Sequence, residues 1–281
     1  MITLIDKSNI LYISFFMSLR EMKEIKGTDE IERSDYPFFV HSLINTFQSY
    51  FIKYKNIYLC EEGLNSTEWR RSIFPDYKAN RSDFKASLNY EHFRNIIKMT
   101  NEFFTYMPCK IVNVENAEAD DVIYALSEKY KKVLIISSDK DLAQIPNKFP
   151  EVELFNPIKK KFVTPHEFIV EEKAIIGDKS DNIPGIPGIG EKTFFRMLED
   201  EEFFNKKMMN GNREIYERFL KIVDLSKCPF IEKIKEKEEE IPFNKFDSES
   251  IQVYLMKNKL VDLLARWPSI EGKIYTKLTE E

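Results

Sequence analysis

The chain has 281 residues, of which 43% are hydrophobic and 14% aromatic, so it can bury a sizeable core and is not intrinsically disordered. Its three widely spaced cysteines form neither a disulfide framework nor a CxxC metal site, and no apolar run reaches the roughly 18 residues of a membrane span. The net charge of −5 argues weakly against a nucleic-acid partner, which usually needs a basic surface. Since the N-terminus lacks a signal peptide, we expect a cytoplasmic protein with no membrane partner. We also expect a monomer.

Short apolar runs alternate with helical patterns along the first part of the chain. Strands are predicted at residues 2–6, 57–60, 110–114, 132–137 and 151–155, and helices at residues 36–52, at residues 118–130 and after Ser8 as a cap. This alternation is typical of βαβ units, in which helices flank a mostly parallel sheet. After residue 177 the pattern changes to a Gly/Pro-rich turn and helices. We therefore predict an α/β core at residues 1–176 and a helical subdomain at residues 177–281.

Acidic residues collect near the predicted carboxyl ends of these strands, where parallel sheets place their functional crevice. Each motif alone has an ordinary explanation, such as a helix dipole at residues 118–121 or a hydrogen-bonded turn at residues 137–141. Together, up to nine carboxylates would converge, and like charges that close cannot all stay ionised without cations. They are Asp6, Glu62, Glu118, Asp120, Asp121, Asp139, Asp141, Asp178 and Asp181.

The donor atoms of this cluster indicate the kind of cation. They are all carboxylate oxygens, and the three histidines of the chain lie outside the cluster, which favours Mg²⁺ or Mn²⁺ over zinc. Two such ions about 4 Å apart are the known arrangement for in-line displacement at phosphate. The sequence therefore predicts phosphodiester hydrolysis with two Mg²⁺ ions, for which Mn²⁺ can substitute.

A second motif is the glycine-rich turn IPGIPGIGEKT at residues 183–193. Gly188 and Gly190 let backbone N–H groups approach a phosphate at a helix N-terminus, where Lys192 and Thr193 can add contacts. The spacing differs from that of a Walker A loop. A tightly packed helical turn is the ordinary explanation, and a grip on DNA phosphates is the interpretation that we favour.

Five segments taken in order resemble motifs of the 5′-nuclease, or flap endonuclease, superfamily over roughly residues 2–200. They are LID (4–6), EADD (118–121), SSDKD (137–141), GDKSDN (177–182) and GIPGIGEKT (185–193). FPDYKANR (74–81) also resembles the start of that family's helical arch. Within the family the chain is most similar to the phage-type enzymes, which include a ribonuclease H. The resemblance implies a PIN/5′-nuclease-like fold with an arch or clamp at residues 63–107.

The resemblance also implies roles for single residues. The metal pair would be held by Asp6, Glu62, Glu118, Asp120, Asp139 and Asp141, with Asp121 nearby and with Asp178 and Asp181 around the second ion. Lys78 and Arg81 would contact the scissile phosphate, and Tyr77 would stack on a frayed base. Residues 183–199 would form a helix–three-turn–helix element, which in the family often holds a monovalent cation such as K⁺. The family usually has Asp where this chain has Glu61-Glu62; Glu62 aligns better, and Glu61 is the alternative.

The arch region is locally basic. Residues 70–98 hold seven basic residues, Lys85 among them, against three acidic ones, with aromatic residues interspersed. This composition suits a guide for single-stranded 5′ ends, although an amphipathic surface helix is an alternative. Threading through a closed arch and clamping by an open one both fit the sequence.

We therefore predict a metal-dependent 5′-3′ exonuclease and flap endonuclease that acts on flapped, branched or nicked DNA and on RNA–DNA hybrids in replication or repair. A single-strand-binding protein or a sliding clamp would be its protein partner. A PIN-type endoribonuclease and a non-catalytic DNA-structure-binding protein are the alternatives. Without the nine clustered carboxylates, 42 basic residues exceed the remaining acidic ones, so the negative total does not exclude DNA.

Overall fold

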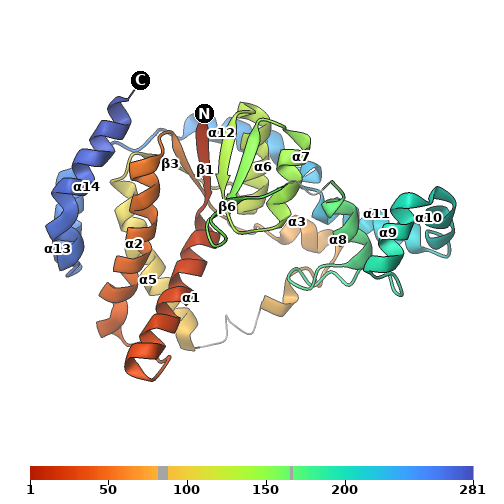
Figure 1. The fold of residues 1–281 in the computed structure, drawn as a ribbon, viewed down its shortest axis with the longest axis horizontal. Helices are drawn as coiled ribbons and strands as arrows, with labels where there is room; N and C mark the ends of the chain where they lie inside the picture. Colours follow the sequence, from red (N-terminus) through yellow and green to blue (C-terminus); the bar gives the residue numbers. More distant parts are fainter. Residues whose placement is uncertain (82–87, 165–166, 281) are drawn as a thin grey trace.

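The computed structural model describes residues 1–81, 88–164 and 167–280, except for the side chains of Arg81 and Leu88 (Figure 1). At its centre lies a six-stranded sheet in the order β3-β2-β1-β4-β5-β6. The strands are β1 (Ile2–Asp6), β2 (Ile57–Cys60), β3 (Cys109–Val112), β4 (Val133–Ile136), β5 (Val152–Asn156) and β6 (Lys161–Phe162). All neighbours are parallel except β5 and β6, so the predicted mostly parallel sheet is confirmed. The two-residue strand β6 was not predicted, because so short a run carries no periodicity.

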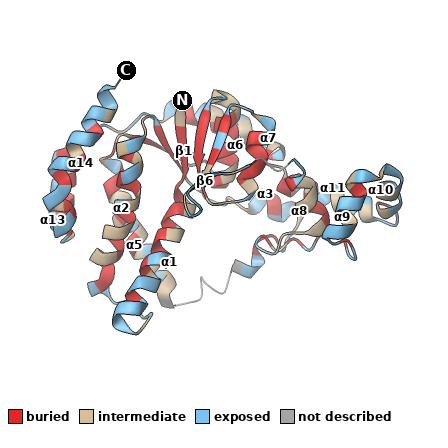
Figure 2. Cartoon of the chain, in the orientation of Figure 1, coloured by how far each residue is buried: buried red, intermediate tan, exposed pale blue. Residues whose placement is uncertain are grey.

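Helices cover both faces of the sheet because its strands are apolar on both sides. Ile5 and Leu59 belong to one core with α1 (Lys7–Lys26), α2 (Tyr36–Lys53) and α5 (Leu88–Thr105). Leu4 belongs to the opposite core with α6 (Ala119–Tyr130), against which α12 (Ile231–Glu240) packs. Buried residues accordingly concentrate in the sheet and on the inner faces of these helices (Figure 2).

A helical extension leaves the core at the right of Figure 1. It contains α8 (Ile169–Ile176), α9 (Glu191–Glu199), α10 (Glu201–Lys207) and α11 (Asn212–Val223). Phe219 and Ala174 pack in one small core there, and Phe194 and Met197 pack in another. The remaining short elements are α3 (Glu68–Ile73), α7 (Gln144–Lys148) and the 3₁₀ turns Arg33–Asp35, Ala79–Arg81, Asp141–Ala143 and Leu225–Lys227.

The C-terminal helices differ from the predicted domain division. α13 (Ser248–Lys257) and α14 (Val261–Thr279) do not join the helical extension but lie at the opposite end of the molecule (Figure 1). Leu263 and Trp267 share the core of α1, α2 and α5. The subdomain predicted at residues 177–281 is therefore too long, since α12, α13 and α14 return to the α/β core. An amphipathic helix pattern predicts a buried face but not the surface that covers it.

Two smaller observations complete the fold. The N-cap of α1 is Asp6 rather than Ser8, since the Asp6 side chain accepts a hydrogen bond from the backbone N–H of Asn9. In the described ranges, no helix combines the length and apolar character that crossing a membrane requires.

Candidate metal centre at the carboxyl edge of the sheet

The register of the parallel strands brings the predicted acidic segments together. Asp6 at the end of β1 lies opposite Cys60 at the end of β2, so Glu62 follows at the same edge. On the other side Ile5 pairs with Ile136, so Asp139 follows there. Parallel strands end at one edge, which is why Asp6 and Asp139, far apart in the sequence, become neighbours.

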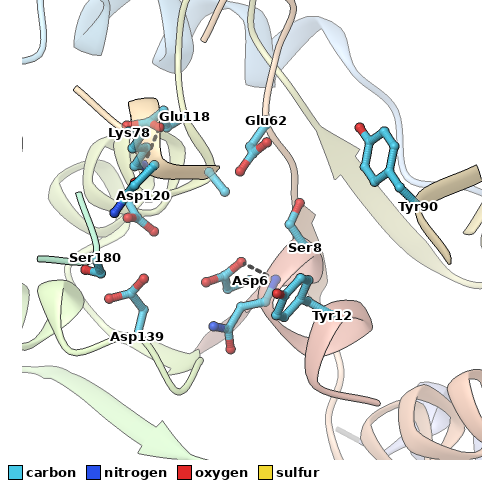
Figure 3. Close-up of a pocket in the computed structure, with 13 residues that line it drawn as sticks. Asp6, Ser8, Tyr12, Glu62, Lys78, Tyr90, Glu118, Asp120, Asp139 and Ser180 are labelled. Carbon is cyan, nitrogen blue, oxygen red and sulfur yellow. Dashed lines mark hydrogen bonds and ion pairs between the residues drawn. The ribbon is translucent and has the colours of Figure 1, made fainter. Parts of the chain in front are cut away.

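These residues line a cleft of about 560 Å³ (Figure 3). Asp6, Asp120 and Asp139 point toward one another across it, and Glu62 comes from the adjoining loop. Its remaining lining residues are Ser8, Asn9, Tyr12, Lys78, Asn80, Tyr90, Glu118, Ala119 and Ser180. The structure thus gathers the strand-end carboxylates around one cavity.

Asp6 is held firmly in this cleft. One carboxylate oxygen accepts from the Asn9 N–H at 3.1 Å, and the other accepts from Ser137 Oγ at 2.8 Å. Burial, together with the charges of Asp139 and Glu62, raises the pKa of Asp6 to about 7 although both hydrogen bonds act to lower it. An Asp of this kind is stabilised by a proton or by a bound cation.

Asp120 shows the same electrostatic situation. Burial raises its pKa well above the ordinary value, and the neighbouring charges of Asp139 and Asp6 act in the same direction. Asp139 is fixed by the turn after β4, where its Oδ1 accepts from the backbone N–H of Asp141 at 2.9 Å. The charges of Asp120 and Asp139 therefore lie close together on side chains whose backbone is fixed by α6 and by the turn after β4.

A second group of carboxylates lies beside the first. Oxygens of Asp141, Asp178 and Asp181 all lie within 4.8 Å of one another. They line a smaller cavity, to which Glu118 and Asp120 also contribute, so the two cavities share a wall.

A lysine from α8 stands in this second group. Lys173 Nζ forms ion pairs with Asp141 and, at 2.6 Å, with Asp178. Asp178 also accepts from the backbone N–H and Oγ of Ser180 at 2.8 and 2.6 Å. No sequence motif singled out Lys173; its position four residues before Gly177, one turn from the acidic loop, is the available signal.

Glu118 joins the two groups. It is buried, and its carboxylate accepts from Lys78 Nζ at 2.5 Å and pairs with Arg70 at 2.8 Å. Although burial acts to raise it, the charges of Lys78 and Arg70 hold the pKa of Glu118 below its ordinary value. Lys78 itself has a left-handed backbone (φ 56°), with its N–H donating to the carbonyl of Asp181.

Asp121 does not face either cavity. Its two oxygens accept from Arg70 at 2.7 and 2.8 Å, and one of them also accepts from the backbone N–H of Glu118. Asp121 was expected near the metal pair, either as a ligand or as a carboxylate behind the ligands, and this geometry fits only the second role, since Arg70 links Asp121 to Glu118. One helical residue beyond Asp120 turns the side chain by about 100°, into the protein.

Tyr77 is also placed differently from the expectation. Its side chain is 3% exposed, and its hydroxyl lies 2.9 Å from Glu118 and 3.2 Å from Asp181. A buried ring cannot stack on a DNA base, so the predicted stacking role is wrong. Tyr77 instead supports the two carboxylates.

The structure brings other aromatic side chains to the cleft. Tyr12 on α1 is 46% exposed, and it lies with Tyr90 of α5 on the side of the cleft away from Lys78 and Asp120 (Figure 3). Sequence reasoning assigned the apolar positions of α1 to the core and passed over Tyr12. The sequence did contain a signal for Tyr12. It follows Ser8 by four residues, so both lie on the same face of the helix that starts at the acidic strand end.

The glycine-rich turn precedes α9 as predicted. Gly188 has φ 78°, and Gly190 is the N-cap of α9. A Cβ added at either glycine would meet no atom within 4 Å, so the surface around both is open. Lys192 is exposed and Thr193 is half-buried in the first turn. Lys85 and the side chain of Arg81 lie outside the described residues.

Comparisons with known proteins agree with this architecture. Bacteriophage T5 D15 protein, co-crystallised with metal ions, is similar with a TM-score of 0.60 at 20% identity, over 85% of this chain and 98% of that one. The catalytic core of Rad2, solved with a DNA substrate, is similar with a TM-score of 0.55 at 11% identity, over 96% of this chain and 91% of that one. The chain therefore has the fold of the 5′-nucleases.

Sequence comparison is more specific. Residues 1–174 match the family described as 5′-3′ exonuclease, N-terminal resolvase-like domain, and the chain belongs to this family. Ribonuclease H of Enterobacteria phage T4 is 32% identical over 159 residues, which cover 53% of this chain and 52% of that protein. A 5′-3′ exonuclease of Buchnera aphidicola subsp. Schizaphis graminum is 34% identical over 162 residues, covering 52% of this chain and 53% of the relative. The chain spans about half the length of these two relatives.

Proposed function

We propose that the protein is a divalent-metal-dependent 5′-nuclease, a 5′-3′ exonuclease and flap endonuclease that hydrolyses phosphodiesters of flapped, branched or nicked DNA. The observation that carries the proposal is the pair of adjoining carboxylate groups at the carboxyl edge of the sheet, with Lys78 between them. Relatives named 5′-3′ exonuclease and a neighbour solved with DNA substrate support it.

The donor set fits two hard divalent cations. Asp6, Glu62, Asp120 and Asp139 would hold one ion, and Asp141, Asp178 and Asp181 the other, with Glu118 and Asp120 on the shared wall. All are carboxylates, which suit Mg²⁺ or Mn²⁺. When bound, such a pair supplies hydroxide from water and stabilises the leaving oxygen.

The protein's own side chains would position the substrate. Lys78 lines the cleft beside Asp120, where its ammonium can donate to a phosphate oxygen and offset developing charge. Tyr12 and Tyr90 present rings at the opposite side, where an unpaired base can stack. Arg81 remains a predicted phosphate contact.

The grip on duplex DNA would lie outside the cleft. At α9, Gly188, Gly190, Lys192 and Thr193 offer open backbone N–H groups, a charge and a hydroxyl to phosphates. Lys159 and Lys160 on the β5–β6 turn and Lys161 at the start of β6 are exposed, at the same edge of the sheet as the cleft. K⁺ binding near α9, cleavage of RNA–DNA hybrids and replication partners remain predictions.

The test uses a 5′-labelled flap substrate with Mg²⁺. Asp139→Asn should reduce cleavage on the order of 10²–10³-fold, because a preorganised charge at the reacting phosphate is lost. Asp262→Asn, at an exposed Asp on α14, is the matched control and should cleave like the wild type.

The same assay separates the alternatives. Equal cleavage by Asp139→Asn and the wild type would overturn the metal assignment. Preference for single-stranded RNA over flap DNA would indicate a PIN-type endoribonuclease. Flap binding by the wild type without cleavage at any Mg²⁺ concentration would indicate a binding protein.

A further inference from the structure

Each of two candidate metal ligands has a charged neighbour in sequence, and these two neighbours form an ion pair. Lys7 follows Asp6, and Glu61 precedes Glu62. Lys7 Nζ pairs with Glu61 Oε1, while Asp6 and Glu62 line the cleft. The pair therefore joins the carboxyl ends of β1 and β2 directly beside the site.

The Lys7 ammonium is almost completely buried, with its side chain 2% exposed. It also lies 4.7 Å from the ring centroid of Phe104 on α5. Burying a charge costs free energy that an apolar residue would not cost, so such a pair is a weak source of stability. Buried charged pairs are better suited to fixing one arrangement of the groups around them.

Glu61 is held from several directions as well. Its backbone N–H donates to the carbonyl of Val112 at 2.9 Å, and its second carboxylate oxygen accepts from Asn113 at 3.3 Å. On the other side of Glu62, a Cβ added to Gly63 would lie 1.8 Å from the carbonyl oxygen of Val114. The backbone is thus fixed both before and after Glu62.

We propose that Lys7 and Glu61 are positioning residues and that their ion pair, the Lys7–Glu61 clasp, sets the separation of Asp6 and Glu62 so that both face one divalent cation. The clasp also decides which of two adjacent glutamates enters the cleft, because Glu61 is committed to Lys7. This inference rests on the proposed function for the presence of the metal ion, but it concerns residues outside the ligand set.

The test is Mn²⁺ binding to the full chain without DNA, followed by electron paramagnetic resonance of free Mn²⁺. Lys7→Met should weaken the tightest Mn²⁺ site about 10–100-fold, the range for groups that orient metal ligands. The direction of the change in Mn²⁺ affinity is diagnostic. By Coulomb's law alone, removal of a nearby positive charge would tighten cation binding rather than weaken it. Unchanged or tighter binding by Lys7→Met would overturn the clasp.

The matched control is the buried pair Lys110–Glu238, which joins β3 to α12 away from the cleft. Lys110 is 8% exposed and also lies over an aromatic ring, that of Tyr58 at 5.4 Å. Lys110→Met should lower the melting temperature and leave Mn²⁺ affinity unchanged. An equal loss of Mn²⁺ affinity in both variants would show a general effect of destabilisation and overturn the proposal.

A second variant keeps the test decisive if Lys7→Met does not fold. Glu61→Gln preserves the size of the side chain and one acceptor oxygen for Lys7, so it should weaken Mn²⁺ binding less than Lys7→Met. Wild-type affinity in Glu61→Gln would then overturn the clasp. A wild-type chain that binds no Mn²⁺ overturns both the clasp and the proposed function. A wild type that binds Mn²⁺ and cleaves flap DNA, with clasp variants that match it, overturns the clasp alone.

Discussion

The two carboxylate groups of the cleft differ in what neutralises them. The open set is Asp6, Glu62, Asp120 and Asp139, and in the described parts of the chain no lysine or arginine forms an ion pair with it. The paired set is Glu118, Asp141, Asp178 and Asp181, which Lys78, Lys173 and Arg70 contact. Side-chain cations therefore compensate the charge of the paired set but not that of the open set, although both lie at the same edge of the sheet.

The pKa shifts follow this difference. Burial raises the pKa of Asp6 to about 7, whereas Asp178, despite partial burial, has a lowered pKa because Lys173 and Ser180 bond to it. Asp141 is an exception within the paired set, since burial and the charge of Asp139 outweigh Lys173 and raise its pKa to about 6. The open set needs a cation from solution, and the paired set carries its own. We therefore expect one tight and one weak divalent site.

Removing Lys78 should have the largest effect on this comparison. Lys78→Ala leaves Glu118 without its closest ammonium and the phosphate without a donor, so single-turnover cleavage should fall about 10²–10³-fold. Flap affinity, measured by fluorescence anisotropy without divalent metal, should change far less. Equal losses in rate and affinity would indicate a plain binding residue, for which Lys192→Ala is the comparison.

The next test concerns the pH dependence of the metal-free protein. Because the folded-state pKa of Asp6 is raised above its unfolded value, its contribution to stability is present at low pH and is lost as pH rises from about 4 through about 7. The melting temperature in EDTA should therefore fall between about pH 4 and about pH 7, and Mg²⁺ should reverse the fall. Asp6→Asn should flatten the profile; an unchanged slope would contradict the assignment.

Removing the built-in cation of the paired set should make the two groups more alike. Lys173→Met frees Asp141 and Asp178 for the weaker ion, whose Mn²⁺ affinity should rise about tenfold, the equivalent of one charge-assisted hydrogen bond. Isothermal titration would show two sites of closer affinity. A weaker second site in Lys173→Met would mean that the lysine organises these carboxylates rather than competing for them.

The smallest expected effect concerns lysines at the two edges of the sheet. It tests whether only those at the edge that carries the cleft contribute to duplex binding. The double variant Lys159→Gln/Lys160→Gln at the cleft edge should weaken duplex binding and lower the salt slope by about 0.9 per lost phosphate contact. The control is Lys131→Gln/Lys132→Gln at the amino edge of the sheet. These two lysines are adjacent and exposed like the first pair, and Lys131 has a positive φ as Lys160 does. Equal losses in both variants would indicate only a general effect of net charge.

Sequence reasoning located the strand ends because apolar runs, the acids that follow them and parallel pairing are local or general features. It misplaced Tyr77 because the orientation of that ring depends on Glu118, which comes from a distant segment. It left two roles open for Asp121 because only the position of Arg70 decides between them. Lys173 and Tyr12 were missed because neither belongs to a motif. The packing of α13 and α14 was not predictable from amphipathicity, which carries no information on the partner surface.

Asp6 and Glu118 are the N-cap residues of α1 and α6, so both helices begin at the cleft. The aligned peptide dipoles of a helix place roughly half a positive charge at its N-terminus. The two helix N-termini together act like about one positive elementary charge. No side chain contributes this charge, and no change of pH removes it. The main chain therefore favours an incoming phosphate at the same place where the carboxylates repel it.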